Sequence, residues 1–312
     1  KTAYEIYQCD WSSDVCSSDL GLPFTAAQYG GTPMTDLLHG VIDIHLHSSP
    51  DVRPRSIDDL AAARAAVAHG MAGVVLKNHH APTADRATVA RLAVPGAPVF
   101  GGVVLNEGVG GLNPDAVEAC AQAGGRITWL PTFGAANHLH RQGAPGATGI
   151  ALLDRRGRPS SALQATFEAI AAHGMALATG HASPTEILVA VPEAFARGVR
   201  RVVITHPESH IVGLAIEDQK RLAAMGALLE RVYAQPDGHG GWQPHLAGNV
   251  AAIRAVGVES TVVASDLGQP ENVGWIDGLA SYVRGLHAAG FTDAEVDRMC
   301  RENPATVVGL TR

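Results

Sequence analysis

The 312-residue sequence carries a formal net charge of −7, is 46% hydrophobic and contains no apolar run of about 18 residues. This length is enough for one large domain with a substantial core. The mild excess of acidic residues lacks the clustered basic face that nucleic-acid binding requires. We therefore exclude nucleic acid and the membrane as partners. We expect a cytoplasmic protein that binds a small molecule, and a homo-oligomer is left open.

The N-terminal segment is set aside before the fold is considered. Residues 9–20 resemble the translation of a sequencing-adapter oligonucleotide of the kind found at the ends of metagenomic reading frames. We treat 1–20 as an adapter-derived, disordered artefact, 21–33 as an uncertain leader and 34–312 as one domain, with Met34 as a candidate start. Of the four cysteines, only Cys120 and Cys300 lie outside this segment, and we expect them to be reduced core thiols.

From residue 41 onward, short runs rich in Val, Ile and Leu alternate with Ala-rich amphipathic stretches. Nearly continuous apolar runs are typical of parallel strands that are buried on both faces. The predicted strands are 41–47, 73–78, 98–105, 126–131, 175–180, 201–206, 227–233 and 260–265. The predicted helices between them include 56–69, 114–123, 162–173, 184–196 and 217–225. A glycine leads from several helices into the next strand, at Gly70, Gly124, Gly174, Gly198, Gly226 and Gly257.

This alternation of eight strands with helices predicts an α/β fold, a (β/α)₈ TIM barrel of parallel strands. No Gly-x-Gly-x-x-Gly follows the first strand, which argues against a dinucleotide-binding sheet. The segment 133–160 after the fourth strand is long for a connection, so we expect an extended loop that covers the barrel mouth as a lid. Catalytic residues of such barrels lie at the carboxyl ends of the strands.

The predicted strand ends carry metal-ligand side chains. The first strand ends in His45 and His47, which strand alternation places on one wall with Asp43 behind them. The fifth and sixth strands lead to His181 and His206, and the eighth to Asp266. Imidazoles and a carboxylate that converge on a barrel mouth are ligands that hold a catalytic Zn²⁺ with one position open for water.

These residues resemble the motif of the amidohydrolase superfamily, which has His-x-His on strand 1, His on strands 5 and 6 and Asp on strand 8 of a (β/α)₈ barrel. The segment 302–310, with its Asn-Pro-Ala and Gly-Leu, is similar to the ending of many members. The resemblance spans roughly 41–310 and implies hydrolysis at carbon or phosphorus by a metal-activated water. It implies a ligand set of His45, His47, His181 and Asp266, with His206 as a second-metal ligand or as the group that polarises the substrate.

The predicted fourth strand departs from the two-metal members of this superfamily. It reads Ile127-Thr-Trp-Leu-Pro-Thr132 and lacks the bridging Lys or Glu. We therefore favour one divalent ion, Zn²⁺ first, with Mn²⁺ or Fe²⁺ as alternatives. Lys77, at the end of the second strand, is a candidate for a bridging ligand, for a contact to a substrate carboxylate, or for a partner of Asp266 or Glu230.

The function we expect is hydrolysis of a small amide, ester or lactone. A bound divalent ion lowers the pKa of its water to about 7. Asp266 is expected to accept the proton and return it to the leaving group, and His206 to stabilise the oxyanion. Lys77 is the third expected catalytic residue. Further candidate substrate contacts, some suited to an anionic group, are Arg53, Arg55, His79, His138, His140 and Glu230.

Two other functions stay open on the sequence. Residues 43–48 also resemble the opening motif of the polymerase-and-histidinol-phosphatase family, a phosphoesterase family in which His79 would fit the end of the second strand. The third strand lacks the Glu expected there, and Ser265-Asp-Leu-Gly268 replaces that family's Asp-x-His. The other alternative is a non-catalytic barrel that binds a metal or a carboxylate.

Overall fold

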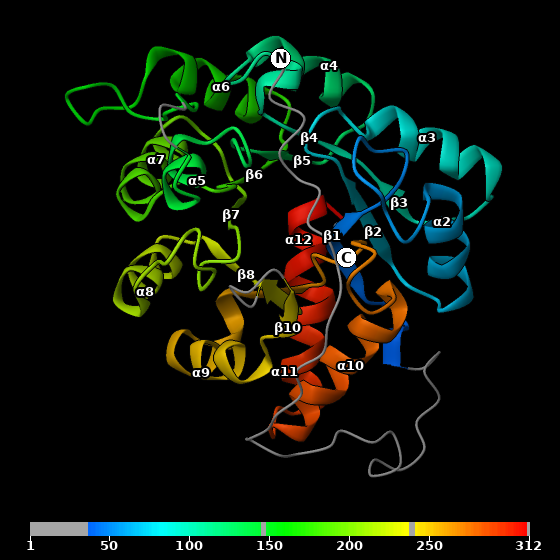
Figure 1. The fold of residues 1–312 in the computed structure, drawn as a ribbon. Helices are drawn as coiled ribbons and strands as arrows, with labels where there is room; N and C mark the ends of the chain where they lie inside the picture. The colour runs from blue at the N-terminus through cyan, green and yellow to red at the C-terminus, as the bar shows by residue number, and fades with distance from the viewer. Residues whose placement is uncertain (1–36, 145–147, 237–240, 311–312) are drawn as a thin grey trace, which may run out of the picture. The chain divides into compact units, whose positions relative to one another are not determined.

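The structure, a computed structural model, describes residues 37–144, 148–236 and 241–310. The expected artefact 1–20 and leader 21–33 lie outside these residues. Parallel strands form the inner layer and helices lie around them (Figure 1). The strands are β1 Ile42–His47, β2 Gly73–Lys77, β3 Val99–Phe100, β4 Gly102–Val104, β5 Ile127–Trp129, β6 Ala176–Ala178, β7 Val202–Ile204, β8 Leu228–Val232, β9 Ala234–Pro236, β10 Trp242–Pro244 and β11 Thr261–Ala264.

Helices follow most of the parallel strands, as the barrel prediction requires. The α-helices are α2 Asp59–Ala68, α3 Ala84–Ala93, α4 Pro114–Gln122, α5 Ala136–Arg141, α6 Ser161–Ala172, α7 Pro184–Ala196, α8 Ile216–Ala224, α9 Leu246–Val256, α10 Trp275–Ala288, α11 Asp293–Asp297 and α12 Asn303–Val308. Short 3₁₀ turns span Glu107–Val109 and Val258–Ser260, and a π-helical turn spans Arg298–Glu302. All six glycines that were predicted to end helices have positive φ, as this role requires. In the described residues no helix is both long and apolar enough to cross a bilayer.

The parallel strands pair in chain order and confirm the (β/α)₈ barrel. One sheet has the order β1-β2-β3 and the other β4-β5-β6-β7-β8-β11. β3 and β4 share one strand position and are separated at Gly101, where a Cβ would lie 2.3 Å from the carbonyl oxygen of Thr83. The two sheets meet again between β1 and β11, because the amide of His47 donates to the carbonyl of Leu267 at 2.9 Å.

The barrel interior is filled by apolar side chains. Ile42, Ile44 and Trp129 belong to this inner core, together with Val307 and Val308 from α12, which packs against β1 and β11. Burying each aliphatic side chain of this size stabilises the fold by about 1.5–3 kcal/mol. The inner core therefore supports a layer of buried polar residues further along the strands, among them Lys77 and Glu230.

The long connection after β5 has structure of its own. Residues 136–141 form the short helix α5, and an antiparallel bridge between Leu153 and Pro159 closes a small hairpin. The side-chain amide of Asn137 donates to the carbonyls of His181 at 3.0 Å and Ile211 at 2.8 Å. α5 is thus fastened to the segments that follow β6 and β7.

Candidate metal centre

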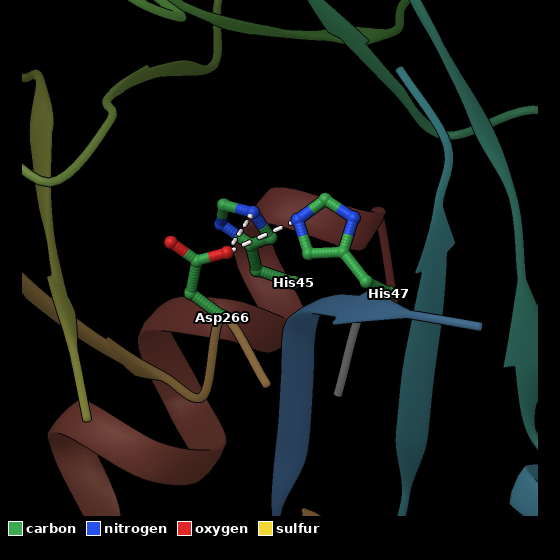
Figure 2. Close-up of side chains that lie close together, drawn as sticks. All are labelled: His45, His47 and Asp266. Atoms are coloured by element: carbon green, nitrogen blue, oxygen red, sulfur yellow. Dashed lines mark hydrogen bonds and ion pairs between the residues drawn. The ribbon is translucent and has the colours of Figure 1, made fainter. Parts of the chain in front are cut away.

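Three of the predicted ligands meet at the carboxyl ends of β1 and β11 (Figure 2). One carboxylate oxygen, Asp266 Oδ1, lies 2.9 Å from His45 Nε2 and 3.1 Å from His47 Nε2. His45 and His47 are almost fully buried, and Asp266 reaches them from the strand that neighbours β1. Among the described residues this is the group of His, Cys, Asp and Glu side chains whose ligand atoms lie close enough to hold one ion.

The two histidines share a wall, but simple strand alternation does not put them there. The register of β1 against β2 shifts between Asp43 and Leu46, as at a β-bulge. Ile44 packs in the inner core, and the next residue, His45, also contacts the inner residues Lys77 and Glu230. The expectation that Asp43 lies behind the histidines on the same face is therefore wrong, because the bulge turns His45 inward.

Asp43 instead holds the backbone segments that carry the candidate ligands. Its Oδ1 accepts hydrogen bonds from the amides of His45 at 3.1 Å and Ser265 at 3.0 Å. Its Oδ2 accepts from the indole Nε1 of Trp275 at 2.7 Å, on α10 outside the barrel. Burial raises the pKa of Asp43 above its ordinary value, against these hydrogen bonds. A fully buried carboxylate thus joins the strand of His45 to the residue before Asp266.

Two strand-end residues have an uncommon backbone conformation. Asp266 has φ of +51° and His206 has φ of +26°, a region that non-glycine residues seldom occupy. Two residues after Asp266, Gly268 also has positive φ, and a Cβ there would lie 1.8 Å from the carbonyl oxygen of His47. Such conformations cost of order 1–3 kcal/mol each and concentrate at functional sites. The backbone after β11 is thus held tightly against the end of β1.

Glu230 on β8 lies behind His45. His45 Nδ1 is 3.0 Å from Glu230 Oε1, while its Nε2 faces Asp266. Burial and the positive charge of Lys77 lower the pKa of His45. The carboxylates of Asp266 and Glu230 outweigh both effects and raise this pKa to about 9. Without an ion, His45 is thus protonated at neutral pH, and each of its two ring nitrogens faces one carboxylate. The pKa of Asp266 is held well below its ordinary value, because His45 and His47 outweigh the effect of burial.

Lys77 completes this buried group. Its Nζ lies 2.8 Å from His45 Nε2 and 5.2 Å above the ring of Trp129. The sequence offered Asp266 or Glu230 as its partner, whereas its hydrogen bond is to the imidazole of His45. Burial lowers the pKa of Lys77 to about 8, against the carboxylates of Asp266 and Glu230. A neutral amine is therefore accessible near neutral pH.

The other two predicted ligands lie beside this group rather than in it. The ring of His206 stacks 6.3 Å from that of His45, and the ring of His181 lies 5.1 Å from that of His206. His206 Nδ1 is buried and has no hydrogen-bond partner among the residues that the structure describes. His181 Nδ1 is 2.8 Å from Nδ1 of His138, which α5 supplies. Burial lowers the pKa of both His206 and His138 to about 4 and keeps the pKa of His181 well below its ordinary value.

A cavity of about 290 Å³ opens above the candidate ligands. His47, His181, His206 and Asp266 line it, whereas His45 lies beneath them. Most candidate substrate contacts also line it, namely Arg53, Arg55, Lys77, His79 and His138. Glu230 lies behind His45, and His140 is exposed on α5, so the structure brings neither into the cavity wall. Part of the expected lid, Phe133, His138 and Gln142, lines the cavity.

The residues present fit a divalent ion. Two imidazole nitrogens and a carboxylate oxygen converge, and bond lengths of about 2.0–2.1 Å around tetrahedral Zn²⁺ place ligand atoms about 3.3 Å apart. The observed separations of 2.9 and 3.1 Å need only a small expansion. An ion bound to His45 Nε2 would also replace the proton that faces Asp266, while the Nδ1 proton would stay with Glu230. Lys77 is compatible with the ion as a neutral amine, because a charged ammonium beside His45 would repel it.

Several parts of the site had no signal in the sequence. The pairing of Asp43 with Trp275, of His138 with His181 and of His79 with Thr132 joins residues far apart in the chain. The hairpin β9–β10 places Trp242 in the cavity wall and was not predicted. Trp242 is a lone large apolar residue in the segment from Pro236 to Pro244, which has no alternation of apolar and polar residues. The ion pair of Arg55 with Asp51 had a weak local signal, since the two residues are four apart.

Solved structures share this fold. An amidohydrolase from Pseudomonas aeruginosa aligns at a TM-score of 0.56 and 12% identity, covering 87% of this chain and 97% of its own. The probable dipeptidase PvdM of the same organism aligns at 0.63 and 11%, covering 86% and 94%. A 2,6-dihydroxybenzoate decarboxylase from Rhizobium aligns at 0.53 and 12%, covering 87% and 99%. The chain thus shares its barrel fold with an amidohydrolase, a probable dipeptidase and a decarboxylase.

Comparison of the sequence with protein families and with curated proteins gives one assignment. No curated protein matches the chain. A family model, described as a family of unknown function, matches residues 40–230, from the strand of the two histidines to Glu230. The chain therefore belongs to the family of unknown function DUF6282.

Proposed function

We propose that this chain is a metal-dependent hydrolase that acts on an amide, ester or lactone bond of a small molecule. The observation that carries the proposal is the shared contact of Asp266 Oδ1 with the Nε2 atoms of His45 and His47, at the base of a 290 Å³ cavity. The amidohydrolase and the probable dipeptidase that share the fold support it by analogy. We propose one ion, with Zn²⁺ favoured over Mn²⁺ and Fe²⁺, because no bridging side chain follows β5.

In this proposal His45, His47 and Asp266 hold the ion, and His181 is the candidate for a further ligand. A bound divalent ion supplies a Lewis acid and lowers the pKa of water toward 7. The second oxygen of Asp266 is directed away from both imidazoles (Figure 2), so it is available to accept a proton from the attacking water. The same carboxyl group then returns the proton to the leaving group.

His206 and His138 have supporting roles in the proposal. Burial keeps His206 neutral at pH 7, since its pKa lies at about 4, and a neutral imidazole donates one N–H to the developing oxyanion. His138 holds the ring of His181 through the contact between their Nδ1 atoms, 2.8 Å apart. A partner of this kind fixes the tautomer and orientation of a ligating histidine. Lys77 is proposed to contact the substrate as an amine or, if carboxylated, to act as a bridging ligand.

The proposal is tested by metal analysis together with a substrate screen. We expect one ion per chain and hydrolysis within a panel of esters, lactones, amides and phosphoesters in the presence of Zn²⁺, Mn²⁺ or Fe²⁺. Asp266→Asn should lower kcat by about 10²–10⁴-fold, because it removes the proton acceptor. His45→Ala should lose the ion, whereas His173→Ala, an exposed histidine at the end of α6, should retain both the ion and the activity.

Each alternative predicts a different result. A tightly bound ion with no hydrolysis of any member of the panel would support a binding protein instead of an enzyme. Hydrolysis confined to phosphoesters would favour the phosphoesterase. Reconstitution with bicarbonate and excess metal addresses Lys77: a second ion per chain and a gain in activity would identify it as a carboxylated bridge, and an unchanged stoichiometry would leave it as a substrate contact.

A further inference from the structure

The cavity above the ligands is basic although the chain as a whole is acidic. The sequence has a formal net charge of −7, yet among the described residues the Arg, Lys, Asp and Glu side chains in the cavity wall are Arg53, Arg55 and Lys77 against Asp266. A low-dielectric cavity lined by one sign of charge concentrates ligands of the opposite sign. The cavity therefore favours an anionic ligand although the chain as a whole is acidic.

Arg55 is held rigidly in that wall. Its side chain is only 4% exposed, and its Nε donates at 2.7 Å to Oδ2 of Asp51, whose side chain is also buried. The terminal nitrogen Arg55 Nη2 is buried and forms the ion pair with the same oxygen at 2.7 Å, but among the described residues it has no acceptor in hydrogen-bond geometry. An unsatisfied buried N–H of a charged group costs free energy that an anionic acceptor would recover.

Arg53 lies at the rim of the same cavity. Its guanidinium carbon stacks 4.3 Å from the ring centre of Phe133, and its side chain forms no ion pair within the parts of the chain that the structure describes. Stacking orients the plane of the guanidinium and leaves its N–H groups at the edge. Phe133, Ile211 and Trp242 provide apolar surface in the same wall. The cavity thus combines two fixed guanidinium groups with an apolar side.

We infer that Arg53 and Arg55 form a binding subsite for a carboxylate, and that the substrate of this site is a small monocarboxylate with an apolar body. The inference rests on the proposed function, because it names the class of molecule that the same cavity takes. Asp51 cancels one of the two guanidinium charges and leaves a single positive charge at the subsite, which a monoanion balances. A phosphate monoester carries a charge of about −1.5 to −2 at neutral pH, more than the subsite neutralises. The volume of 290 Å³ limits the molecule to a small size.

Binding of model ligands to metal-free protein tests this subsite without hydrolysis. The probes are benzoate, its neutral analogue benzamide and the dianion phenyl phosphate, each titrated calorimetrically in phosphate-free buffer. We expect benzoate to bind at least about tenfold more tightly than benzamide, since a hydrogen bond to a charged group is worth that factor or more. The dissociation constant for benzoate should rise with ionic strength.

Two variants and a matched control identify the residues. Arg53→Gln removes an exposed charge with little risk to the fold, and Arg55→Lys keeps the pair with Asp51 but loses the guanidinium fork. Each should weaken benzoate binding by about tenfold or more. Arg64→Gln, on the exposed side of α2, should leave it unchanged. Equal binding of benzoate and benzamide, tighter binding of phenyl phosphate, no binding of benzoate, or wild-type affinity in both variants would overturn the inference.

The test separates this inference from the proposed function. If benzoate binds as expected and no substrate is hydrolysed with any metal, the carboxylate subsite stands and the hydrolase proposal fails. If neutral esters are hydrolysed and benzoate does not bind, the hydrolase proposal stands and the subsite is wrong.

Discussion

The conformations of Asp266 and His206 place these two side chains at the cavity at the expense of stability. Both have positive φ without being glycine, and each lies two residues after the last residue of a buried strand. Replacing either by glycine would relieve the backbone but remove the side chain that faces the cavity. The strain is compensated by the surroundings, such as the amide of Asp266, which donates to the carbonyl of His45 at 2.9 Å.

Glu230 provides a prediction at this scale. Glu230→Gln keeps the shape and the acceptor oxygen beside His45 Nδ1 but removes the negative charge that makes His45 a stronger ligand. We expect the affinity for the metal ion to fall by about 10- to 100-fold, the usual effect of such a change. Competition with a chromophoric chelator measures it. Glu118→Gln, on the exposed face of α4, is the matched control, and equal metal affinity in both variants would show that Glu230 has no role in the site.

The candidate ligands could be predicted because barrels place chemistry at strand ends, and strands buried on both faces are visible as apolar runs. His45, His47 and Asp266 were found in this way, although 219 residues separate His47 from Asp266. Their hydrogen-bond partners could not be predicted. The contact of His138 with His181 depends on how the loop after β5 folds back, and no local pattern encodes a pair 43 residues apart.

At the scale of elements, the sequence predicted where strands and helices lie but not their irregularities. Every predicted strand is present within a few residues. The bulge in β1 was missed, since Ile44 and His45 alternate in the sequence as they would in a regular strand, and only the register against β2 reveals the shift. The pair β9–β10 was missed for a similar reason. The two short strands are held by their backbone pairing with each other, and neither has an alternation of apolar and polar residues.

The junction of β1, β11 and α10 depends on Asp43, and this gives a prediction. Asp43→Ala leaves two amides and the Nε1 of Trp275 without their acceptor in a buried place. Unsatisfied buried donors cost about 1–3 kcal/mol each, so we expect the free energy of unfolding to fall by about 3–5 kcal/mol. Trp275→Phe removes one of the three hydrogen bonds and should cost about 1–2 kcal/mol. Urea unfolding measures both.

The metal affinity of the same variants tests whether the junction also positions the ligands. Asp43 holds the amide of His45 and that of Ser265, the residue before Asp266. Asp43→Ala should therefore bind the ion more weakly under conditions in which it remains folded, whereas Trp275→Phe, which leaves both amides bonded, should bind it nearly as the wild type does. Equal metal affinity in all three proteins would restrict Asp43 to a purely structural role.

At the scale of the whole molecule, the candidate ligands come from opposite ends of the chain. β1 supplies His45 and His47, and Asp266 follows β11, the last strand of the barrel. An ion held by these residues would join the first strand to the last across the place where the two sheets meet. The protein bonds at this seam include the amide of His47 to Leu267 and the amide of Asp266 to His45, each 2.9 Å long. The metal centre would thus also close the barrel.

Metal binding should therefore stabilise this seam more than the rest of the barrel, and hydrogen exchange can measure the difference. An ion at 100 times its dissociation constant stabilises the folded chain by about 2.7 kcal/mol against global unfolding. If it also suppresses local opening, chelation should speed exchange of the His47 and Asp266 amides. The amides of Leu177 and Thr179, which bond β6 to the strand β7, are the internal reference and should change much less. Equal acceleration at both places would mean that the ion stabilises the barrel only globally. No change at either would mean that no ion joins β1 to Asp266, because a ligand that bridges two strands must resist their separation.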